Sequence, residues 1–208
     1  MQDSARKEPG LPDPNDVRAE RDALRREVAR LAAELAEAQA RASRLESLAR
    51  EDPLTGLLNR RGFLRDLARA VAYRSRYGTS TAVLIADVDG FKPVNDTYGH
   101  AVGDRALAHV AALLRDNLRA SDAIGRLGGD EFGVILWHAD ERAARQKALS
   151  LEAIVAGSPL AASGLTLTLG VSIGVASLEP GDGADAVLAR ADRAMYARKH
   201  ERKARGRR

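Results

Sequence analysis

Two clusters of carboxylates stand where strands are expected to end. Asp87 and Asp89 close a nearly continuous apolar run over 81–88, and Asp130 and Glu131 fall at the tip of an expected hairpin. Carboxylates that face one another at a strand end are costly unless a cation lies between them. Ligand sets made only of oxygen favour Mg²⁺ or Mn²⁺ over zinc, and Mg²⁺ commonly brings a phosphate substrate with it. Either cluster alone is more typical of a solvated turn, so the prediction of a metal-dependent phosphate site rests on the two together.

A pair of glycines precedes the second cluster. Gly128 and Gly129 supply the positive φ of a tight turn and let a ligand approach the main chain closely. By itself a Gly-Gly hairpin predicts only a turn. Here the run continues with Asp130, Glu131 and Phe132.

These five residues, Gly-Gly-Asp-Glu-Phe, resemble the signature of the GGDEF domains, most of which are diguanylate cyclases. Further motifs of that family occur in the expected order over roughly residues 50–200, namely an entry motif at 52–60, Asp87 to Lys92, Asn95 to His100, and Gly103-Asp104. The resemblance implies an α/β (α+β) sandwich of the nucleotidyl-cyclase palm type, with a mixed central sheet and a β-hairpin. It also implies that two GTP molecules are condensed into cyclic di-GMP with release of two pyrophosphates.

The resemblance places the acidic residues in metal binding and catalysis. Asp87, Asp130 and the backbone carbonyl of Val88 match the family's metal ligands, and Glu131 matches a second acidic position that also counts among them. Two Mg²⁺ (or Mn²⁺) ions per active site would neutralise the triphosphate and bring the ribose 3′-oxygen towards the α-phosphorus. Asp130 is the first choice for the group that takes the 3′-OH proton and Glu131 the second. Lys92 matches a catalytic lysine close to the phosphates.

Asn95 and Asp104 match the pair that reads guanine in this family. A carboxylate accepts from both N1–H and the 2-amino group of guanine, whereas adenine presents an acceptor at N1, so Asp104 favours GTP. His100 matches a position near the substrate, with a structural histidine as the alternative. The resemblance also places the turn of Gly128 and Gly129 against the substrate.

Two lysines near the end of the domain are expected at the phosphates. Lys199 matches a phosphate-binding lysine on the last helix. The Gly-Arg-Asn step that usually follows it in the family is replaced here by Arg202-Lys203-Ala204. Lys203 is therefore expected in place of the phosphate-binding arginine, with a weaker contact because lysine lacks the bidentate fork of arginine.

Arg119 and Asp122 form an Arg-x-x-Asp pair upstream of the hairpin, with five residues between Asp122 and Gly128. An ordinary ion pair at a helix end is the alternative reading of such a pair. At this offset it resembles the family's inhibitory site, which binds a stacked dimer of cyclic di-GMP. Arginine suits phosphate and the Hoogsteen edge of guanine, and aspartate suits its N1–H and amino group. The resemblance therefore implies feedback inhibition by the product.

The hydrophobic pattern over 52–200 predicts the elements that position these residues. Helical spacing alternates with apolar runs typical of strands, and this alternation with one hairpin indicates a mixed-sheet α/β sandwich. The expected helices cover 60–76, 101–119, 140–156 and 183–200, and the expected strands cover 81–88, 122–127, 132–137 and a pair near 165–177.

A heptad pattern precedes this domain. From Val17 to Ala49, apolar residues recur in alternating steps of three and four, with one exception and with no Gly or Pro. The pattern predicts a coiled-coil helix over 17–51, more typical of a parallel dimer than of an amphipathic helix packed on its own domain. The Pro-rich, charged residues 1–16 are expected to be a disordered leader, and 201–208 a basic tail.

Composition excludes several classes of protein. The 208 residues contain no cysteine, which excludes a disulfide scaffold, a cysteine nucleophile and a Cys-ligated zinc site. An aromatic content of 4% weakens the case for a stacking platform for single-stranded nucleic acid. The net charge of +4 arises at the end of the chain, since residues 1–50 carry ten basic and ten acidic side chains whereas 195–208 carry seven basic and one acidic. Nucleic acid is therefore not the expected partner. The sequence also lacks a secretory signal and an apolar run long enough for a bilayer, so we expect no membrane association and a cytoplasmic location.

Together these patterns predict a diguanylate cyclase that works as a homodimer through its coiled coil. Each site would hold one GTP, so a cyclic product needs two sites face to face, and the coil would raise the effective concentration of the second. Two other classes stay open. One is a non-catalytic GGDEF sensor that binds cyclic di-GMP or GTP, against which the intact hairpin motif argues. The other is a coiled-coil interaction protein whose basic tail contacts nucleic acid or an anionic partner.

Overall fold

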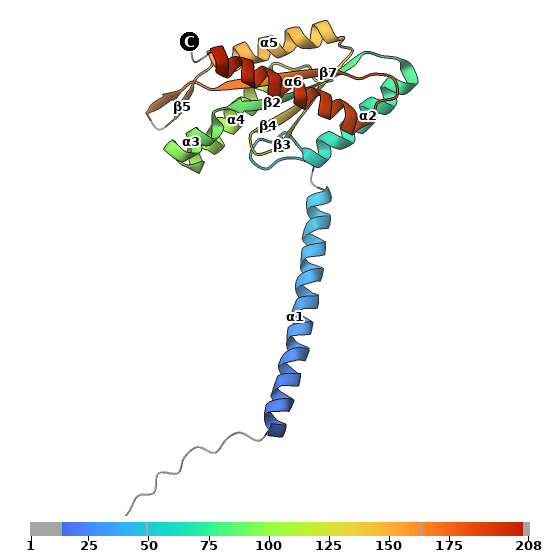
Figure 1. Cartoon of the computed structure of the whole chain (residues 1–208), viewed down its shortest axis with the longest axis vertical. Helices are drawn as coiled ribbons and strands as arrows, with labels where there is room; N and C mark the ends of the chain where they lie inside the picture. Colours follow the sequence, from blue (N-terminus) through green and yellow to red (C-terminus); the bar gives the residue numbers. More distant parts are fainter. Residues whose placement is uncertain (1–13, 49, 163, 206–208) are drawn as a thin grey trace, which may run out of the picture. The chain divides into compact units, whose positions relative to one another are not determined.

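The computed structural model describes residues 14–48, 50–162 and 164–205, and the chain divides into two units at Leu48 (Figure 1). The first unit contains a single described helix, α1 (Pro14–Leu48). It begins three residues before the predicted start, because proline fixes φ near its helical value and suits the first turn of a helix. The rest of the predicted disordered leader lies outside the described residues.

A row of apolar side chains on α1 is exposed. The side chains of this row are between 50% and 69% exposed, and they are Leu24, Val28, Leu31, Leu35 and Leu45. Such a row is typical of a helix that buries its apolar stripe against a partner. No helix within the described residues is both long and apolar enough to cross a bilayer.

A five-stranded sheet forms the centre of the second unit, in the order β1-β3-β4-β2-β7. β1 runs parallel to β3 and the other neighbouring pairs are antiparallel, so the predicted mixed sheet is confirmed. The strands are β1 (Leu58–Asn59), β2 (Thr81–Asp89), β3 (Ala123–Gly128), β4 (Glu131–Trp137) and β7 (Gly170–Ser177). A separate hairpin pairs β5 (Leu160–Ala162) with β6 (Leu165–Leu167).

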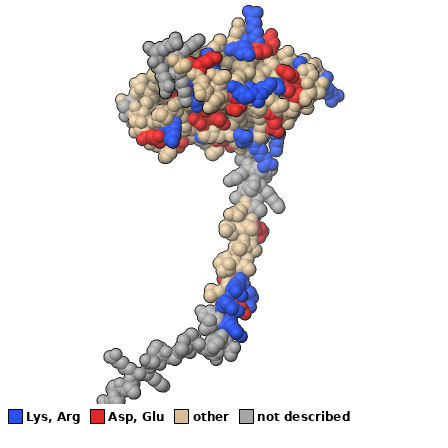
Figure 2. Space-filling view, viewed as in Figure 1, with Lys and Arg blue, Asp and Glu red and all other residues tan. Residues whose placement is uncertain are grey.

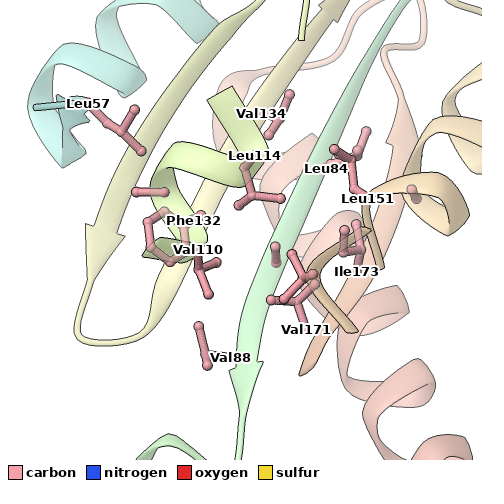
Figure 3. Close-up of a cluster of buried hydrophobic side chains, with 14 of the residues drawn as sticks. Leu57, Leu84, Val88, Val110, Leu114, Phe132, Val134, Leu151, Val171 and Ile173 are labelled. Atoms are coloured by element: carbon pink, nitrogen blue, oxygen red, sulfur yellow. The ribbon is translucent and has the colours of Figure 1, made fainter. Parts of the chain in front are cut away.

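Helices α4 (His100–Asp116) and α5 (Glu141–Gly157) cover one face of this sheet, and α2 (Arg60–Tyr77) and α6 (Ala184–Arg205) cover the other. The short helix α3 (Phe91–Tyr98) contacts α4. Strand β2, which lies between β4 and β7, is buried on both sides, as its continuous apolar run predicts. Leu84, Ala86 and Val88 pack in one cluster with α4 and α5, which Figure 3 shows. Val83 and Ile85 point the other way and pack with α2 and α6.

Basic and acidic side chains are interspersed on the face of the second unit that Figure 2 shows. A polyanion-binding face is instead typically marked by a patch or stripe of one sign. This face therefore gives no support to nucleic-acid binding.

The region between β2 and β3 differs from the sequence prediction. Residues 91–98 form α3, which buries no residue and so leaves no periodic apolar signal. Gly99, with φ at 80°, separates α3 from α4. α4 ends at Asp116 instead of 119, because the Asn117 side chain donates to the carbonyl of Leu113 and closes the helix.

The predicted strand pair near 165–177 was only partly right. β7 joins the central sheet beside β2, whereas β6 pairs with β5 outside it. Two-residue strand β1 was also missed, because a strand this short leaves no alternation to detect.

Candidate active site

The two acidic clusters meet where β2 ends and β4 begins. Asp87 is the antiparallel partner of Glu131, and the backbone N–H of Val88 donates to the carbonyl of Asp130 at 3.1 Å. Side chains of directly paired residues project from the same face, about 5 Å apart. Asp87 is buried, whereas Asp130 and Glu131 are half-buried. The structure therefore brings together carboxylates that the sequence places in two separate motifs.

The turn between β3 and β4 is shaped by its glycines. Gly128 has φ at 148° and Gly129 at 51°, which glycine adopts without steric cost. No atom lies within 4 Å of the position of a Cβ on either residue, so the space beside the main chain is open. The Arg126 guanidinium donates to the carbonyl of Gly129 at 2.8 and 3.0 Å. Asp52 from the entry motif contacts the same guanidinium at 3.3 Å, so it anchors the turn through Arg126.

Asp52 is suited to this anchoring role. Burial raises the pKa of Asp52, but hydrogen bonds from the Thr55 backbone and hydroxyl and the charge of Arg126 outweigh it, so the pKa lies below its ordinary value. The carboxylate therefore stays ionised over a wide pH range. Sequence reasoning missed Arg126, because nothing in a strand residue's type reveals which loop its side chain reaches.

Lys199 of α6 reaches the end of β2. Its ammonium forms a hydrogen-bonded ion pair with Oδ1 of Asp87. Burial lowers the pKa of Lys199, but the hydrogen bond and charge of Asp87, with the charges of Asp130 and Asp89, outweigh it and raise the pKa above its ordinary value. Sequence analysis expected Lys199 at phosphate and Asp87 at metal, and the structure makes each the counter-charge of the other.

A cavity of about 280 Å³ opens beside this ion pair, and it is lined by Asp87, Glu131, Asp192, Met195, Tyr196, Lys199 and His200. Burial raises the pKa of Glu131, and the negative charges of Asp87, Asp192 and Asp130 raise it further, against a lowering by Arg60. Asp192 is a further acidic residue of the site that the sequence analysis missed. Its only signal was its position seven residues before Lys199, which places both on nearly the same helix face.

The oxygen donors fit a hard divalent cation, although the protein alone does not complete a ligand cluster. Within residues 14–48, 50–162 and 164–205, no group of three or more His, Cys, Asp or Glu side chains could hold a metal ion. Mg²⁺ is commonly held by one or two carboxylates together with water and substrate phosphates, without an all-protein cage. Asp87, Asp130 and the carbonyl of Val88 are donors of this kind.

The predicted guanine-reading residues lie on α3 and α4. Oδ1 of Asn95 is buried and has no hydrogen-bond partner among the described residues, which is unusual for a buried acceptor. A Cβ at Gly103 would lie 1.8 Å from this oxygen, so the Asn95 side chain rests against the bare backbone of Gly103. Asp104 follows Gly103 and is exposed, as are Lys92 and His100. The structure therefore brings Asn95 beside the turn of α4 that carries Asp104.

Two arginines dock the end of α6 on α5 and on the end of β2. The carboxylate of Glu152, which is 6% exposed, accepts from Nη2 of Arg198 at 2.7 Å. The guanidinium of Arg202 lies 3.5 Å from both Glu152 and Asp89. These ion pairs fix the turns of α6 that reach the acidic cluster. The side chain of Lys203, predicted to bind phosphate, lies outside the described residues.

Arg119 and Asp122 lie at the opposite end of β4, about 20 Å from its first residue, for a strand rise of about 3.4 Å per residue. The Asp122 carboxylate accepts from the backbone N–H groups of Arg119 at 3.0 Å and Trp137 at 3.3 Å. The Arg119 side chain is exposed. Both residues line a small cavity of about 80 Å³, together with Trp137 and His138.

Residues 49–205 match the family described as diguanylate cyclase, GGDEF domain. The chain is 40% identical over 145 residues to diguanylate cyclase DgcP of Pseudomonas aeruginosa, a match that covers 70% of this chain and 22% of that protein. It is 40% identical over 146 residues to diguanylate cyclase DosC of Escherichia coli, a match that covers 70% of this chain and 32% of that protein. The chain thus spans about a fifth to a third of the length of these relatives.

Solved structures show the same fold. The coiled coil and GGDEF domain of DgcB from Caulobacter crescentus in complex with c-di-GMP matches with a TM-score of 0.71 and 28% identity, over 86% of this chain and 95% of that one. The GGDEF domain of DgcB, also in complex with c-di-GMP, matches with a TM-score of 0.71 and 31% identity, over 73% and 88%. The predicted α+β palm-like fold is therefore confirmed.

Proposed function

Because the chain belongs to the GGDEF-domain family, we propose that it is a diguanylate cyclase, which condenses two GTP molecules into cyclic di-GMP and releases two pyrophosphates. The observation that carries the proposal is the pairing of Asp87 with Glu131 beside the turn of Gly128 and Gly129, with the Lys199 ammonium at the same point. Carboxylates and an ammonium fixed in this way serve the electrostatic and positional catalysis that phosphoryl transfer requires.

Asp87, Asp130 and the Val88 carbonyl would hold Mg²⁺ or Mn²⁺, with two ions per active site. Bound there, the ions supply the positive charge that neutralises the triphosphate. The Lys199 ammonium contacts Asp87 and needs only to change partner to bind a phosphate oxygen. Lys92 is exposed on α3 and is proposed to contribute a second ammonium at the phosphates.

The proton of the 3′-OH has two candidate acceptors, Asp130 and Glu131. Burial and the neighbouring carboxylates raise the pKa of Glu131. Cations bound at these carboxylates would lower that pKa again, so the choice between Asp130 and Glu131 rests on the kinetics of their variants. The pH dependence of the rate in a Glu131→Gln variant separates the two assignments, since loss of the acidic limb identifies Glu131 as the acceptor and its retention leaves Asp130.

Asn95 and Asp104 are proposed to select guanine. The unpartnered Oδ1 of Asn95 is an acceptor without a donor, and the guanine 2-amino group is a donor of the matching kind. Asp104 can accept from N1–H and the amino group, whereas adenine offers an acceptor at N1. GTP is therefore expected to be used in preference to ATP. His100, the first residue of α4, is exposed and is available at the same side of the substrate.

We further propose that α1 joins two chains into a homodimer. Its exposed apolar row extends along a helix of 35 residues, about 52 Å at 1.5 Å per residue, and a second copy would bury it. Each subunit would bring one GTP to a shared reaction, because one site holds one nucleotide. The coil would keep the second half-site at a high effective concentration.

Product inhibition is proposed at Arg119 and Asp122. The exposed Arg119 guanidinium is free to reach phosphate or the Hoogsteen edge of guanine. Asp122 uses its carboxylate to close the turn, which fixes the orientation of the pair. Cyclic di-GMP bound there would lie at the far end of β4 from the acidic cluster.

Chromatography of nucleotides after incubation with GTP and Mg²⁺ tests the proposal. We expect the full chain to form cyclic di-GMP, the Asp130→Ala variant to form none, and the Arg119→Ala variant to accumulate more than the wild type. If the wild type forms no product but binds cyclic di-GMP tightly, the cyclase proposal is wrong and the chain is a non-catalytic sensor. If the chain neither turns over GTP nor binds cyclic di-GMP, both the cyclase and the sensor function are excluded. The coil and basic tail would then be tested as an interaction module.

A further inference from the structure

Strand β7 forms one edge of the central sheet, and it contacts both α5 and α6 (Figure 1). Successive residues of an edge strand direct their backbone N–H and C=O groups alternately towards the neighbouring strand and away from it. Three hydrogen bonds identify the residues of β7 that face away: Glu152 accepts from the N–H of Ile173 at 3.1 Å, Arg202 donates to the carbonyl of Val171, and Arg190 donates to the carbonyl of Ser177 at 2.8 Å. The odd-numbered residues of β7 therefore point their backbone groups outward.

The middle of this edge is open. Val175 lies midway between Ile173 and Ser177, so its N–H and C=O both point outward, together with the C=O of Ile173. Within residues 50–162 and 164–205, no hydrogen bond reaches these three groups. Val175 is also half-buried, whereas Gly174 and Ala176 on either side of it are buried. An edge with free N–H and C=O groups is a template for another strand, and charged side chains cover β7 only towards its ends.

A groove of about 370 Å³ lies over the open part of the edge. The residues that line it there are Gly174 and Val175 of β7, Ala148 and Leu149 of α5, and Ala194 and Ala197 of α6. Three of the four helix residues are alanine, so the walls leave space beside the backbone of β7. Leu149, which is 55% exposed, gives the groove an apolar wall. The next strand of a sheet would lie about 4.8 Å from β7, which is within this space.

The groove is positively charged at one end. A second hollow of about 420 Å³ shares Arg145 and Leu149 with the groove and continues along α5 to Glu141 and Arg142. The carboxylate of Glu141 accepts from Arg145 at 2.5 and 2.9 Å. In the described part of the chain Arg142 has no acidic partner, so its charge is uncompensated. A carboxylate on a ligand would complement this end of the groove.

We propose that the open part of β7 binds an extended peptide segment of a partner protein, which joins the five-stranded sheet as a sixth strand. Its main chain would donate to the C=O of Val175 and accept from the N–H, because an extended polypeptide presents donors and acceptors at the spacing of a sheet edge. Side chains of directly paired residues project from the same face, so the residue opposite Val175 would lie beside Leu149 on the α5 side. The segment is therefore expected to carry an apolar residue there and a carboxylate within reach of Arg142.

A second copy of β7 does not fit this edge. Glu152 of α5 pairs with Arg198 of α6 at 2.7 Å, and it also accepts from the outward N–H of Ile173, so this ion pair passes around the edge. α5 and α6 therefore extend past β7 on either side, and the strand is recessed between them. A single segment can enter such a groove, whereas the edge of another whole sheet would bring its own two helices against α5 and α6.

Hydrogen exchange tests the open edge in the full chain without a partner. The amide proton of Val175 should exchange at least about 10-fold faster than that of Gly174, whose backbone groups face β2. Equal protection of the two amides would show that the edge is not free and would refute the proposal.

Peptide selection tests the ligand. A displayed library of seven random residues would be selected against the immobilised full chain, and a selected sequence would be synthesised for calorimetric titration. We expect binders that combine an apolar residue with a carboxylate, and at saturation the exchange of the Val175 amide should slow by about 10-fold or more. N-methylation of successive peptide amides should weaken binding at alternate positions only. A selection without binders, or a binder that leaves the exchange of Val175 unchanged, would overturn the proposal.

Two tryptophan substitutions on α6 test whether the peptide occupies the groove. Ala197→Trp places an indole in the groove from an exposed position and should weaken binding of the synthetic peptide by about 10-fold or more. Ala186→Trp is the matched control, since Ala186 is exposed on the same helix about 16 Å before Ala197, and it should bind as the wild type does. Equal affinities of the two variants would place the peptide elsewhere on the molecule.

Charge reversal at Arg142 provides a test that leaves the walls of the groove unchanged. Arg142→Glu should weaken binding of the carboxylate peptide by about 3- to 5-fold, whereas a peptide with an amide in place of the carboxylate should bind the variant and the wild type equally. The same loss with both peptides would refute the placement of the segment along α5. None of these measurements uses turnover of GTP, so their results do not bear on the proposed cyclase.

Discussion

Replacing Gly103 by alanine tests whether the position of the Asn95 side chain controls use of the substrate. An added Cβ would lie 1.8 Å from Oδ1 and 2.9 Å from Cγ of Asn95, and 3.3 Å from Cζ of Phe91. The first two separations are too short for any real structure, so the Asn95 side chain must leave its position. Each of the three contacted atoms belongs to a side chain, and the backbone of α4 is therefore free to stay where it is.

The expected size of the change in KM and in stability follows from one effect on folding and one on substrate binding. Alanine is favoured over glycine inside a helix by about 1 kcal/mol, so α4 should not lose stability beyond the cost of moving one side chain. Losing one neutral hydrogen bond between Asn95 and guanine costs about 1 to 1.5 kcal/mol. We therefore expect KM for GTP to rise about 5- to 13-fold in Gly103→Ala, with little change in the midpoint of thermal unfolding.

A double-mutant cycle decides whether Gly103 acts through Asn95. Steady-state kinetics with GTP would be measured for Gly103→Ala, Asn95→Ala and the double variant. In the Asn95→Ala background the added Cβ meets no amide, so the double variant should match Asn95→Ala alone. An unchanged KM in Gly103→Ala, or losses that add in the double variant, would refute this reasoning.

Three further perturbations test other parts of the molecule. Arg198→Met removes the closest cation from the buried Glu152 carboxylate, so the free energy of unfolding in a urea titration should fall by about 3 kcal/mol. A fall of only a few tenths of a kcal/mol would mean that Arg202 alone compensates the charge of Glu152. The pKa of Asp52 is lowered in the folded state, so its contribution to stability is fully present above the unfolded-state pKa and is lost as pH falls through the folded-state pKa. Asp52→Asn should therefore lower the free energy of unfolding at neutral pH and make it fall less steeply in acid. Parallel pH profiles of the free energy of unfolding for the variant and the wild type would contradict this. Deleting residues 1–48 should make specific activity depend steeply on protein concentration, whereas full activity at high dilution would show that the reaction does not need α1.

Local patterns carried much of the fold and of the acidic part of the site. The apolar run over 81–88 predicted a buried strand, and the Gly128-Gly129 pair predicted the hairpin that presents Asp130 and Glu131. These features are encoded within a few neighbouring residues. α3 was missed because it packs few apolar residues, and its glycine boundaries resemble ordinary loop signals.

Contacts between distant elements depend on how close two backbones approach. The Arg126 contact with Asp52 and the Arg202 contact with Asp89 join residues whose types alone fit many surface roles. Their partners follow from the register of the sheet and the docking of α6, which no local pattern specifies.

The ion pair between Lys199 and Asp87 can nevertheless be derived once one close approach is known. A Cβ at Gly174 would lie 2.0 Å from the backbone nitrogen of Met195, so only glycine lets α6 lie directly on β7 at this point. Gly174 is paired with Ile85, which therefore lies beside Met195. One helical turn beyond Met195, about 6 Å, is Lys199, and two strand residues beyond Ile85, about 6.6 Å, is Asp87. These two distances along α6 and β2 are nearly equal, so the Lys199 ammonium meets the Asp87 carboxylate at the end of β2. Gly174, a glycine inside a predicted strand, was the signal in the sequence for this contact. It positions Lys199 at the site, as the hairpin positions Asp130 and Glu131.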